Sequence, residues 1–398
     1  MTVSRPPVSD WKTDFDHLDP HWLEDPYPIW DDLRQMCPIA HTERYTGAYL
    51  PTKYDDIRTI AYDTENFTSA RVSLRVERAV PAVPNPPLTL DPPHHRPSRM
   101  MILPLFTPQA IKAYEPQITE LCDRLIDRFI DRGHCDGAVE YAQEITARMM
   151  ARFFGVPEDM GPQFRTWIYE NLELGLVEPD VYARSTREID DYFLVEIAKR
   201  RREPTDDLIA YLMRAEFNGA LMSDAEIAAA LRLLMTAGIG TTWSTIGASI
   251  WHLATHPEDL ARLVAEPELM PTAVEEFLRA YAPASLAREV LRDVEVGGCK
   301  LKAGQMVFMA FPAGNRDPAV FPDADKVILD RKDNKHMAFG IGIHRCLGSN
   351  LARIEIRIGL ERLIARIPRF TLDREKDVVW SESHIRGVRK VPIVFGQQ

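Results

Sequence analysis

The most informative stretch of the 398-residue sequence is Phe339-Gly340-Ile341-Gly342-Ile343-His344-Arg345-Cys346-Leu347-Gly348. Its glycines lie mostly on one side of a lone cysteine, and a pattern typical of a helix, residues 351–367, follows on the other side. Glycine lets the backbone approach a ligand closely and adopt positive φ. A cysteine at a helix N-terminus feels the positive end of the helix dipole, which favours the thiolate. A single thiolate without neighbouring Cys or His at metal spacing suggests a cofactor that brings its own remaining ligands, as haem does.

The decapeptide fits every position of the signature F-G-x-G-x-H-x-C-x-G, and in this respect the sequence resembles the cytochrome P450 family. The resemblance implies that Cys346 is the axial ligand of the iron of haem b. It also implies that Phe339 packs beside the haem near the sulfur and that His344 reaches a haem propionate. Gly340 and Gly348 belong to the same cofactor-binding loop. The alternative is a glycine-rich turn beside a core cysteine.

A second stretch, residues 91–99 with the sequence D-P-P-H-H-R-P-S-R, resembles the family pattern D-P-P-x-H-x-x-x-R. His95 and Arg99 are four residues apart, so they share one face of a helix. The resemblance implies that both bind the haem propionates, and that Arg288 does so as well. Pro97 departs from the common pattern and predicts that the helix begins later than His95.

A third stretch, residues 276–279 with the sequence E-F-L-R, resembles the family's E-x-x-R motif. Glu276 and Arg279 are three residues apart and can form an ion pair, and Arg331 lies where the family often supplies a third partner. We expect a structural role for these three residues. If the pair is buried it needs further hydrogen bonds, and the alternative is an ordinary surface ion pair.

Residues 223–255 form the longest predicted helix. Ser223 and Glu226 have the spacing of a capping box, and Arg232 is the only formal charge between residues 227 and 254. A transmembrane span is the obvious alternative. The arginine, the glycines and the hydroxyl residues favour instead a helix that is buried on all sides in a large α-rich core.

Within this helix, residues 237–242, A-G-I-G-T-T, resemble the family motif [AG]-G-x-[DE]-T-[TS]. The resemblance implies that Ala237 and Gly238 leave room for dioxygen, and that Thr241, with Thr242 beside it, acts in catalysis by hydrogen-bonding it. Gly240 replaces the acid that normally gates proton delivery. Either water occupies the space that the missing side chain leaves, or the glycine serves local packing. The first alternative encourages a peroxide-driven peroxygenase and predicts that Gly240→Asp raises coupled turnover.

By resemblance, the substrate pocket is lined by mostly small and apolar residues, namely Leu233, Thr236, Ala237, Ala284, Leu286 and Ile385. This set suits a modest aromatic, terpenoid or aliphatic substrate. Arg71, Arg75 and Arg78 would share one face of a short helix. We interpret them as a solvated face, with an anionic substrate as the alternative.

The coarse pattern predicts one cytochrome P450 haem domain over residues 1–398, mainly α with small β-sheets, in which the haem lies between the long central helix and the Cys346 loop. Helical spacing dominates residues 108–367. The β signals are short, at residues 47–51, 294–296, 305–309 and 388–395. Residues 81–93 include six prolines and are predicted to be a loop.

Composition narrows the class of protein. The formal net charge of −11 argues against a nucleic-acid partner. Five cysteines without a C-x-x-C pair argue against a disulfide scaffold or zinc ribbon and favour a reducing compartment. Residues 1–28 are polar and proline-rich and show neither a secretory signal nor a membrane anchor. We therefore expect a cytoplasmic enzyme without a membrane partner.

The resemblance implies a monooxygenase that inserts one atom of O2 into an organic substrate, and the alternatives are a peroxygenase or a non-catalytic haem sensor. The sequence contains no G-x-G-x-x-G and no iron–sulfur cysteine cluster, so no flavin or iron–sulfur centre is expected. Electrons would come from NAD(P)H through a ferredoxin and its reductase, or through a fused reductase, because residues 237–244 resemble self-sufficient members. An acidic ferredoxin could dock on arginines near Cys346, which are otherwise ordinary surface residues: Arg345, Arg353, Arg357, Arg362 and Arg366.

Overall fold

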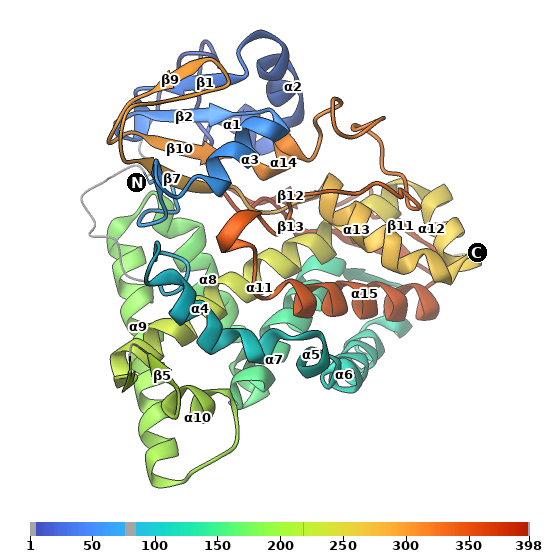
Figure 1. Cartoon of the computed structure of the whole chain (residues 1–398). Coiled ribbons are helices and arrows are strands. Elements are labelled where there is room, and N and C mark those ends of the chain that lie inside the picture. Colours follow the sequence, from blue (N-terminus) through green and yellow to red (C-terminus); the bar gives the residue numbers. More distant parts are fainter. Residues whose placement is uncertain (1–4, 76–84, 218, 397–398) are drawn as a thin grey trace.

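The long helix α11 (Asp224–Thr255) runs through the middle of the fold, as Figure 1 shows for the computed structural model of the protein. Ser223 caps it with both halves of the predicted capping box, because the Glu226 N–H donates to Ser223 Oγ and the Ser223 N–H donates to the Glu226 carboxylate. The helix packs against α7 (Gln143–Phe154), α8 (Gly161–Leu172), α9 (Pro179–Arg202) and α15 (Ser349–Arg366). Most of its residues are therefore buried, as expected for a central helix.

The structure describes residues 5–75, 85–217 and 219–396. None of the helices in these ranges is long and apolar enough to cross a membrane. The remaining helices of the α-rich part are α4 (His95–Ile102), α5 (Pro108–Lys112), α6 (Glu115–Asp127), α10 (Leu208–Met213), α12 (Pro257–Ala265) and α13 (Met270–Ala280). Four short helices accompany the largest sheet, namely α1 (Pro20–Glu24), α2 (Tyr27–Met36), α3 (Tyr54–Tyr62) and α14 (Phe311–Gly314).

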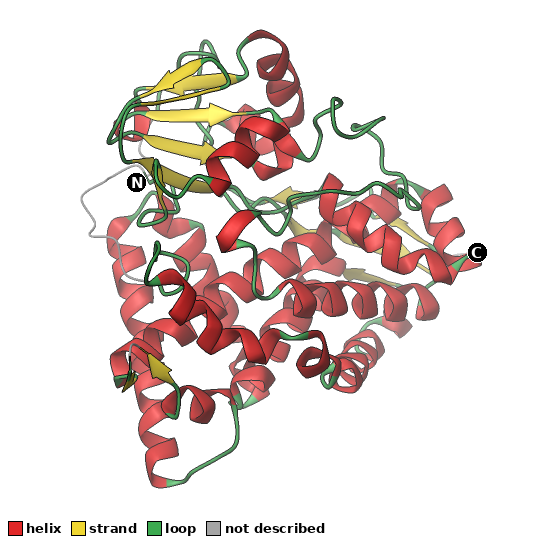
Figure 2. Ribbon diagram, in the orientation of Figure 1, coloured by secondary structure: helices red, strands yellow, loops and turns green. Residues whose placement is uncertain are grey.

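The sheets are small, and the largest lies at one side of the helical mass, at the upper left of Figure 2. The largest has the order β1 (Ile39–Thr42), β2 (Ala48–Pro51), β10 (Met306–Met309), β7 (Leu286–Val290) and β3 (Phe67–Thr68). A three-stranded sheet joins β11 (Phe370–Leu372), β14 (Pro392–Phe395) and β4 (His134–Asp136). Two-stranded pairs complete the set: β12 (Val379–Trp380) with β13 (Val388–Lys390), β5 (Glu216–Phe217) with β6 (Ala220–Leu221), and β8 (Val294–Val296) with β9 (Cys299–Leu301).

Most predicted elements are confirmed with small changes at their ends, but the short helix expected around Arg71 and Arg75 is wrong, because residues 71–75 contain neither helix nor strand. The mainly α fold with small sheets is present, and α15 begins two residues earlier than the sequence pattern suggested. The single run predicted over residues 388–395 is wrong, because it divides into β13 and β14, which pair in different sheets. Residues 85–93 contain neither helix nor strand, as expected from their prolines, whereas residues 81–84 and Arg78 lie outside the described residues.

The expectation that α4 (His95–Ile102) begins later than His95 is wrong. The helix begins at His95, so Pro97 is the third residue of its first turn. The backbone N–H groups of a first turn have no partner within the helix, and a proline there sacrifices no hydrogen bond. His95 and Arg99 consequently lie on the same helix, one turn apart.

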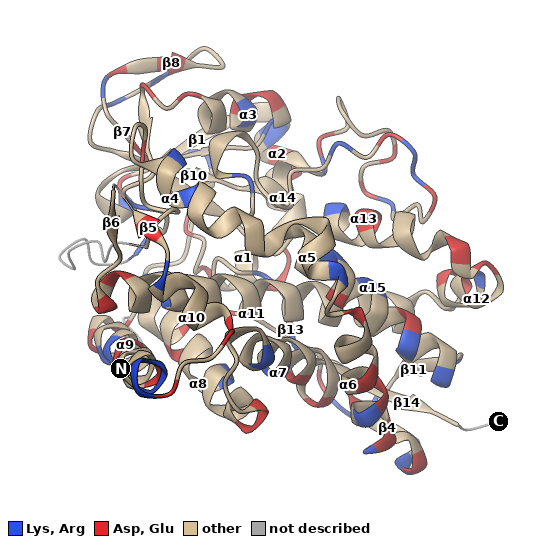
Figure 3. Ribbon diagram, turned by 60° about the horizontal axis from the view of Figure 1, so that its bottom comes forward, with Lys and Arg blue, Asp and Glu red and all other residues tan. Residues whose placement is uncertain are grey.

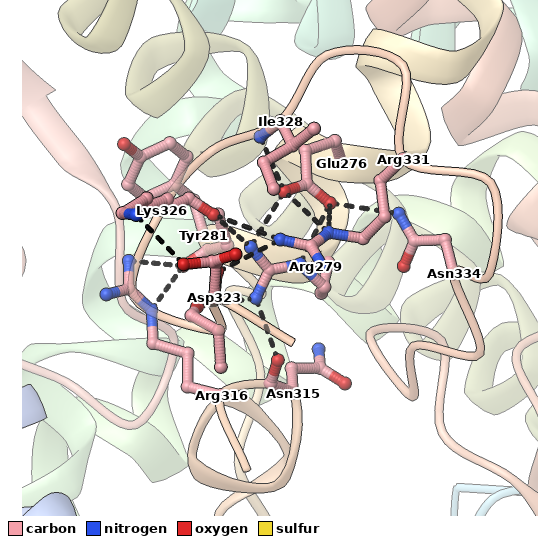
Figure 4. Close-up of polar contacts among 12 residues, drawn as sticks. Glu276, Arg279, Tyr281, Asn315, Arg316, Asp323, Lys326, Ile328, Arg331 and Asn334 are labelled. Carbon is pink, nitrogen blue, oxygen red and sulfur yellow. Dashed lines mark hydrogen bonds and ion pairs between the residues drawn. The ribbon is translucent and has the colours of Figure 1, made fainter. Parts of the chain in front are cut away.

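The buried carboxylate of Glu276 on α13 is the centre of a polar cluster (Figure 4). Arg279 donates to it from two nitrogens at 2.7 and 2.8 Å, and both side chains have no exposed surface. Arg331 and the backbone N–H of Ile328 donate to the same carboxylate, as does Asn334. The motif is therefore a buried ion pair with the additional hydrogen bonds that burial requires.

Arg279 also fixes the long irregular segment that leads toward the cysteine loop. Its guanidinium donates to the backbone carbonyls of Asn315, Ala324 and Lys326 at 2.6–3.0 Å. The side chain of Asn315 then accepts from the N–H of Met337, two residues before Phe339. Because this segment has little regular secondary structure of its own, the polar cluster determines where the cysteine loop begins.

We expect Glu276→Ala to reduce the free energy of unfolding by about 3–5 kcal/mol, because it leaves a buried guanidinium without its counter-charge. Urea unfolding followed by circular dichroism measures this change. Asp330→Ala is the matched control, since it breaks an exposed ion pair with Arg262 and should cost less than about 1 kcal/mol. Equal losses of unfolding free energy in the two variants would show that the buried pair stabilises the fold no more than an exposed one.

Candidate active site

A cavity of about 380 Å³ lies beside α11 and is large enough for a cofactor-sized ligand. The residues predicted to bind the cofactor or the substrate all border it, although they come from distant parts of the sequence. These residues are Leu233, Thr236, Ala237, Gly238, Thr241, Thr242, Ala284, Leu286, Arg288, His95, Arg99, Phe339, Gly340, His344, Cys346, Gly348 and Ile385. Gly240 and the Glu276 cluster do not border it.

The cysteine loop is folded back on itself beside the cavity. The N–H of Cys346 donates to the carbonyl of Phe339 at 2.8 Å, which brings the two ends of the decapeptide together. Gly340 and Gly342 have φ of +63° and +74°, in the left-handed region that favours glycine. A Cβ at Gly342 would also lie 2.7 Å from the carbonyl oxygen of Ala61 on α3. The glycines are therefore needed for the loop's shape and for its close approach to α3.

The thiol of Cys346 lies two residues before Gly348, the N-cap of α15, and is exposed toward the cavity. The protein around the thiol desolvates it and raises its pKa. The N–H of Gly348, followed by Arg99, Arg345 and Arg353, acts in the opposite direction. The predicted environment at the positive end of a helix is thus present, and a cation bound in the cavity would stabilise the thiolate further.

Four basic side chains gather at one part of the cavity: His95, Arg99, Arg288 and His344. The rings of His95 and His344 are 4.4 Å apart, and His344 Nε2 is 2.8 Å from Ser69 Oγ. Arg99 donates to the carbonyl of Arg345 at 2.5 Å, and Arg288 donates to that of Ala287 at 2.8 Å. In the described part of the chain no ion pair joins any of the four to a carboxylate.

Arg99 and Arg288 are the permanent cations of this group, because burial disfavours the charged form of both histidines. Burial lowers the pKa of Arg288 to about 10, and burial together with Arg288, His95 and Arg99 lowers that of His344 to about 3. His95 is buried, and its Nε2 has no partner among the described residues. A buried arginine, Arg288, that forms no ion pair with the described residues and the orphaned ring nitrogen of His95 fit a ligand that brings carboxylates, as haem does with its propionates.

The wall formed by α11 presents small and hydroxyl-bearing residues. Ala237 is exposed to the cavity, and the Thr241 hydroxyl donates to its carbonyl at 2.8 Å. Thr242 and Thr245 also border the cavity, and Thr245 donates to the carbonyl of Thr241 at 3.2 Å. The hydroxyls of Thr241 and Thr245 are satisfied within the helix, so the wall offers polar atoms without unpaired charge.

The two glycines of this wall face other helices with their missing side chains. A Cβ at Gly238 would lie 2.3 Å from Met150 Cε on α7. A Cβ at Gly240 would lie 3.3 Å from Ile168 and Leu172 of α8. The expectation of a space beside Thr241 that holds water at Gly240 is therefore not met, because apolar side chains fill that direction. The structure favours the packing alternative.

Four residues that border the cavity were not assigned to it from sequence, and one of them is Arg71, which we interpreted as part of a solvated face. Arg75, which we interpreted in the same way, lines the cavity as well, and so do His384 and Glu355. Burial raises the pKa of Glu355 well above its usual range and so favours the neutral carboxyl. Helical spacing alone carries no signal for the side that Arg75 faces, and a lone His or Glu in sequence carries none for burial.

The basic patch predicted on α15 is largely neutralised. Arg353 pairs with Glu275, Arg357 with Glu115 and Glu361, and both Arg362 and Arg366 pair with aspartates of α6. Figure 3 shows both signs of charge along α15 and α6. Arg345 is exposed and forms no ion pair with the described residues. Sequence missed this because the partner carboxylates are as many as 242 positions away.

Comparison with known proteins gives consistent matches along the chain. The sequence profile of the cytochrome P450 family matches residues 180–385. Mycinamicin IV hydroxylase/epoxidase of Micromonospora griseorubida is 31% identical over 92% of this chain and 94% of the relative. Vitamin D(3) 25-hydroxylase of Pseudonocardia autotrophica is 32% identical over 94% of both. The solved structure of cytochrome P450 PksS of Bacillus subtilis covers 96% of this chain and 100% of its own, with a TM-score of 0.89 and 28% identity.

We expect Gly240→Asp to lower the free energy of unfolding by about 1–3 kcal/mol, because it forces a carboxylate against Ile168 and Leu172. Arg389, which bonds Ser244 one turn further along α11, is already paired with Glu173 and offers no free charge. Gly240→Ala is the control and should change stability far less. Unfolding in urea measures both, and a Gly240→Asp variant as stable as the alanine variant would show that the space accepts an acid.

Proposed function

The chain belongs to the cytochrome P450 family of haem-dependent monooxygenases, and from that premise we propose that it inserts one atom of O2 into an apolar organic substrate of small to medium size. The observation that carries the proposal is that one cavity is bordered by the Cys346 thiol, by four basic side chains that form no ion pair with the described residues, and by the Thr241 wall of α11. These are the three parts that a haem monooxygenase needs.

Haem b fits the residues that border the cavity. Cys346 would supply the axial thiolate, and Arg99, Arg288, His95 and His344 would hold the propionates. When bound, haem with a thiolate ligand supplies the activation of dioxygen, which the protein's own side chains cannot perform. The Cys346 loop would thus hold the cofactor at its metal, and the basic group would hold it at its carboxylates.

The α11 wall would position the oxygen reactant and control a proton. Ala237 has only a methyl group and leaves room beside the thiol-bearing loop. The hydroxyl of Thr241 donates to the Ala237 carbonyl now, and rotation about χ1 would turn the same O–H toward a ligand in the cavity. Thr241 Oγ1 is therefore the atom that we propose holds the proton.

The electron source is proposed from the family resemblance. A ferredoxin with its NAD(P)H-dependent reductase, or a fused reductase, would supply two electrons per turnover. Arg345, beside Cys346 and exposed, is the basic residue that an acidic ferredoxin could contact, whereas the arginines of α15 are already paired. The peroxygenase alternative rested on a space at Gly240, and the packing of Gly240 against α8 removes that argument.

The proposal is tested by reconstitution with a bacterial ferredoxin, ferredoxin reductase and NAD(P)H under isotopically labelled dioxygen. A substrate can be found first by screening organic compounds for a shift of the ferric spin state. One labelled oxygen atom in the product is the expected result, with none when the label is in the water instead. Product that carries oxygen from water would contradict the proposed reaction.

We expect Thr241→Ala to lower the product formed per NAD(P)H consumed by at least about tenfold, with hydrogen peroxide released instead, because a positioned proton donor is lost. Thr241→Ser keeps the hydroxyl and should keep most of the coupling. The measurement is the ratio of product to NAD(P)H in each variant. Equal ratios for the alanine and serine variants would show that the hydroxyl is not used.

We expect Arg288→Gln to act in opposite directions on the two forms of the protein. It removes a cation whose burial outweighs the attraction of the Asp91 carboxylate, so the haem-free chain should be at least as stable as the wild type. Haem should be lost to apomyoglobin roughly ten to a hundred times faster, because a charged hydrogen bond to a propionate is removed. An unchanged rate of haem loss would show that Arg288 does not bind a haem propionate.

A further inference from the structure

Basic side chains border the cavity in two groups that do not overlap. The first is the group proposed to hold the propionates, which lies beside the cysteine loop. The second consists of Arg75 and His384, from two other segments of the chain. The charges that influence His384 are His17 and Arg75, whereas those that influence His344 are Arg288, His95 and Arg99. An anion bound at the first group therefore leaves the second group without a counter-charge.

Arg75 is held in place but is not neutralised. One of its nitrogens donates to the carbonyl of Gly175 at 2.5 Å, and the guanidinium lies over the ring of Tyr182 at 3.7 Å. No ion pair joins Arg75 to a carboxylate in the described ranges of the chain. Arg71, four residues earlier and also bordering the cavity, lies 3.4 Å from a carboxylate oxygen of Glu289. Arg71 thus has a carboxylate partner within the protein and Arg75 has none among the described residues, so Arg75 is the better candidate to bind an anion.

His384 is the second half of this group. It is 92% buried, and its Nδ1 has no hydrogen-bond partner among the described residues. Its backbone carbonyl accepts from the N–H of Ser285, and the neighbouring residues Ile385 and Ala284 form a β-bridge. The ring is therefore fixed on the same two segments that supply predicted pocket residues. Burial next to His17 and Arg75 lowers its pKa to about 3, so it is a neutral imidazole at pH 7.

Apolar side chains make up much of the remaining wall. Leu74, Leu88, Leu233 and Ile385 border the cavity, and α11 contributes Ala237. A ligand that satisfies the whole surface would have one charged end and a hydrocarbon body. The planar guanidinium has nitrogens left over for two parallel hydrogen bonds, which is the geometry that a carboxylate accepts. A single permanent cation matches a single negative charge.

We propose that the substrate is an apolar monocarboxylic acid whose carboxylate binds Arg75, with His384 donating a further hydrogen bond, and whose hydrocarbon part lies along the cavity wall toward Ala237 and Thr241. This inference rests on the proposed function, because it names the substrate class of that site. It assigns to Arg75 a role in substrate selection and to Arg71 none.

Spectral titration of the haem-loaded ferric protein tests the inference with acid and amide pairs of the same shape. The probes are dodecanoic acid against dodecanamide, and cinnamic acid against cinnamamide. At least one acid should bind about tenfold more tightly than its amide, which is the effect of one charged hydrogen-bonding pair. Arg75→Gln should abolish the preference. Arg71→Gln, the matched control on the same segment, should retain it.

Three results would overturn the inference. The first is equal or weaker binding of both acids relative to their amides in the wild type, a result that does not depend on any variant. The second is an acid preference that survives Arg75→Gln, and the third is one that disappears in Arg71→Gln. Each leaves the proposed monooxygenase reaction standing, because failure of that reaction would show instead as a product without oxygen from labelled dioxygen.

Discussion

The fully buried ion pair between Glu276 and Arg279 is the interaction on which the architecture of the site depends. Each partner has no exposed surface, so the pair is stable only because backbone and side-chain groups of a distant segment complete its hydrogen bonds. The same bonds tie that segment to α13 and end, through Asn315 and Met337, at the start of the cysteine loop. The segment that leads into the cysteine loop is thus tied to a charge pair outside the cavity.

The central helix has a second kind of constraint, which is the division of its faces. Toward the cavity it presents Ala237 and the hydroxyls of Thr241 and Thr242. Toward its neighbours it presents Gly238 and Gly240, against which Met150 and the side chains of α8 pack closely. Small residues in one short run therefore serve two purposes. The direction of a residue's Cα–Cβ bond decides whether its small size leaves room for a ligand or lets a neighbouring helix pack closely.

Much of this arrangement could be predicted from the sequence, because the signals for it are local. The capping box at Ser223, the helix after Cys346 and the spacing of Glu276 and Arg279 depend on residues within one or two turns, and the structure contains all three features. The cofactor and pocket residues that were predicted from the family motifs all border one cavity. The roles proposed for these residues are open to the experiments described above.

What sequence could not supply depends on contacts between distant segments. Arg75 reaches the cavity because Gly175 and Tyr182 hold it there, and His384 joins it from more than 300 positions away. Arg357 and Arg362 of α15 form ion pairs with carboxylates of α6. Gly240 packs against side chains of α8. Periodicity places such residues on a helix, but it does not say which neighbour the helix will meet.

The central claim is that Cys346 supplies a thiolate to haem in this cavity. The absorption spectrum of the reduced protein with carbon monoxide tests it most directly, since the Soret band is strongly red-shifted only when the ligand opposite carbon monoxide is a thiolate. The wild type should show this band, and a Cys346→His variant that still binds haem should lose it. A red-shifted band in Cys346→Ala or Cys346→His would contradict the assignment and require a different iron ligand.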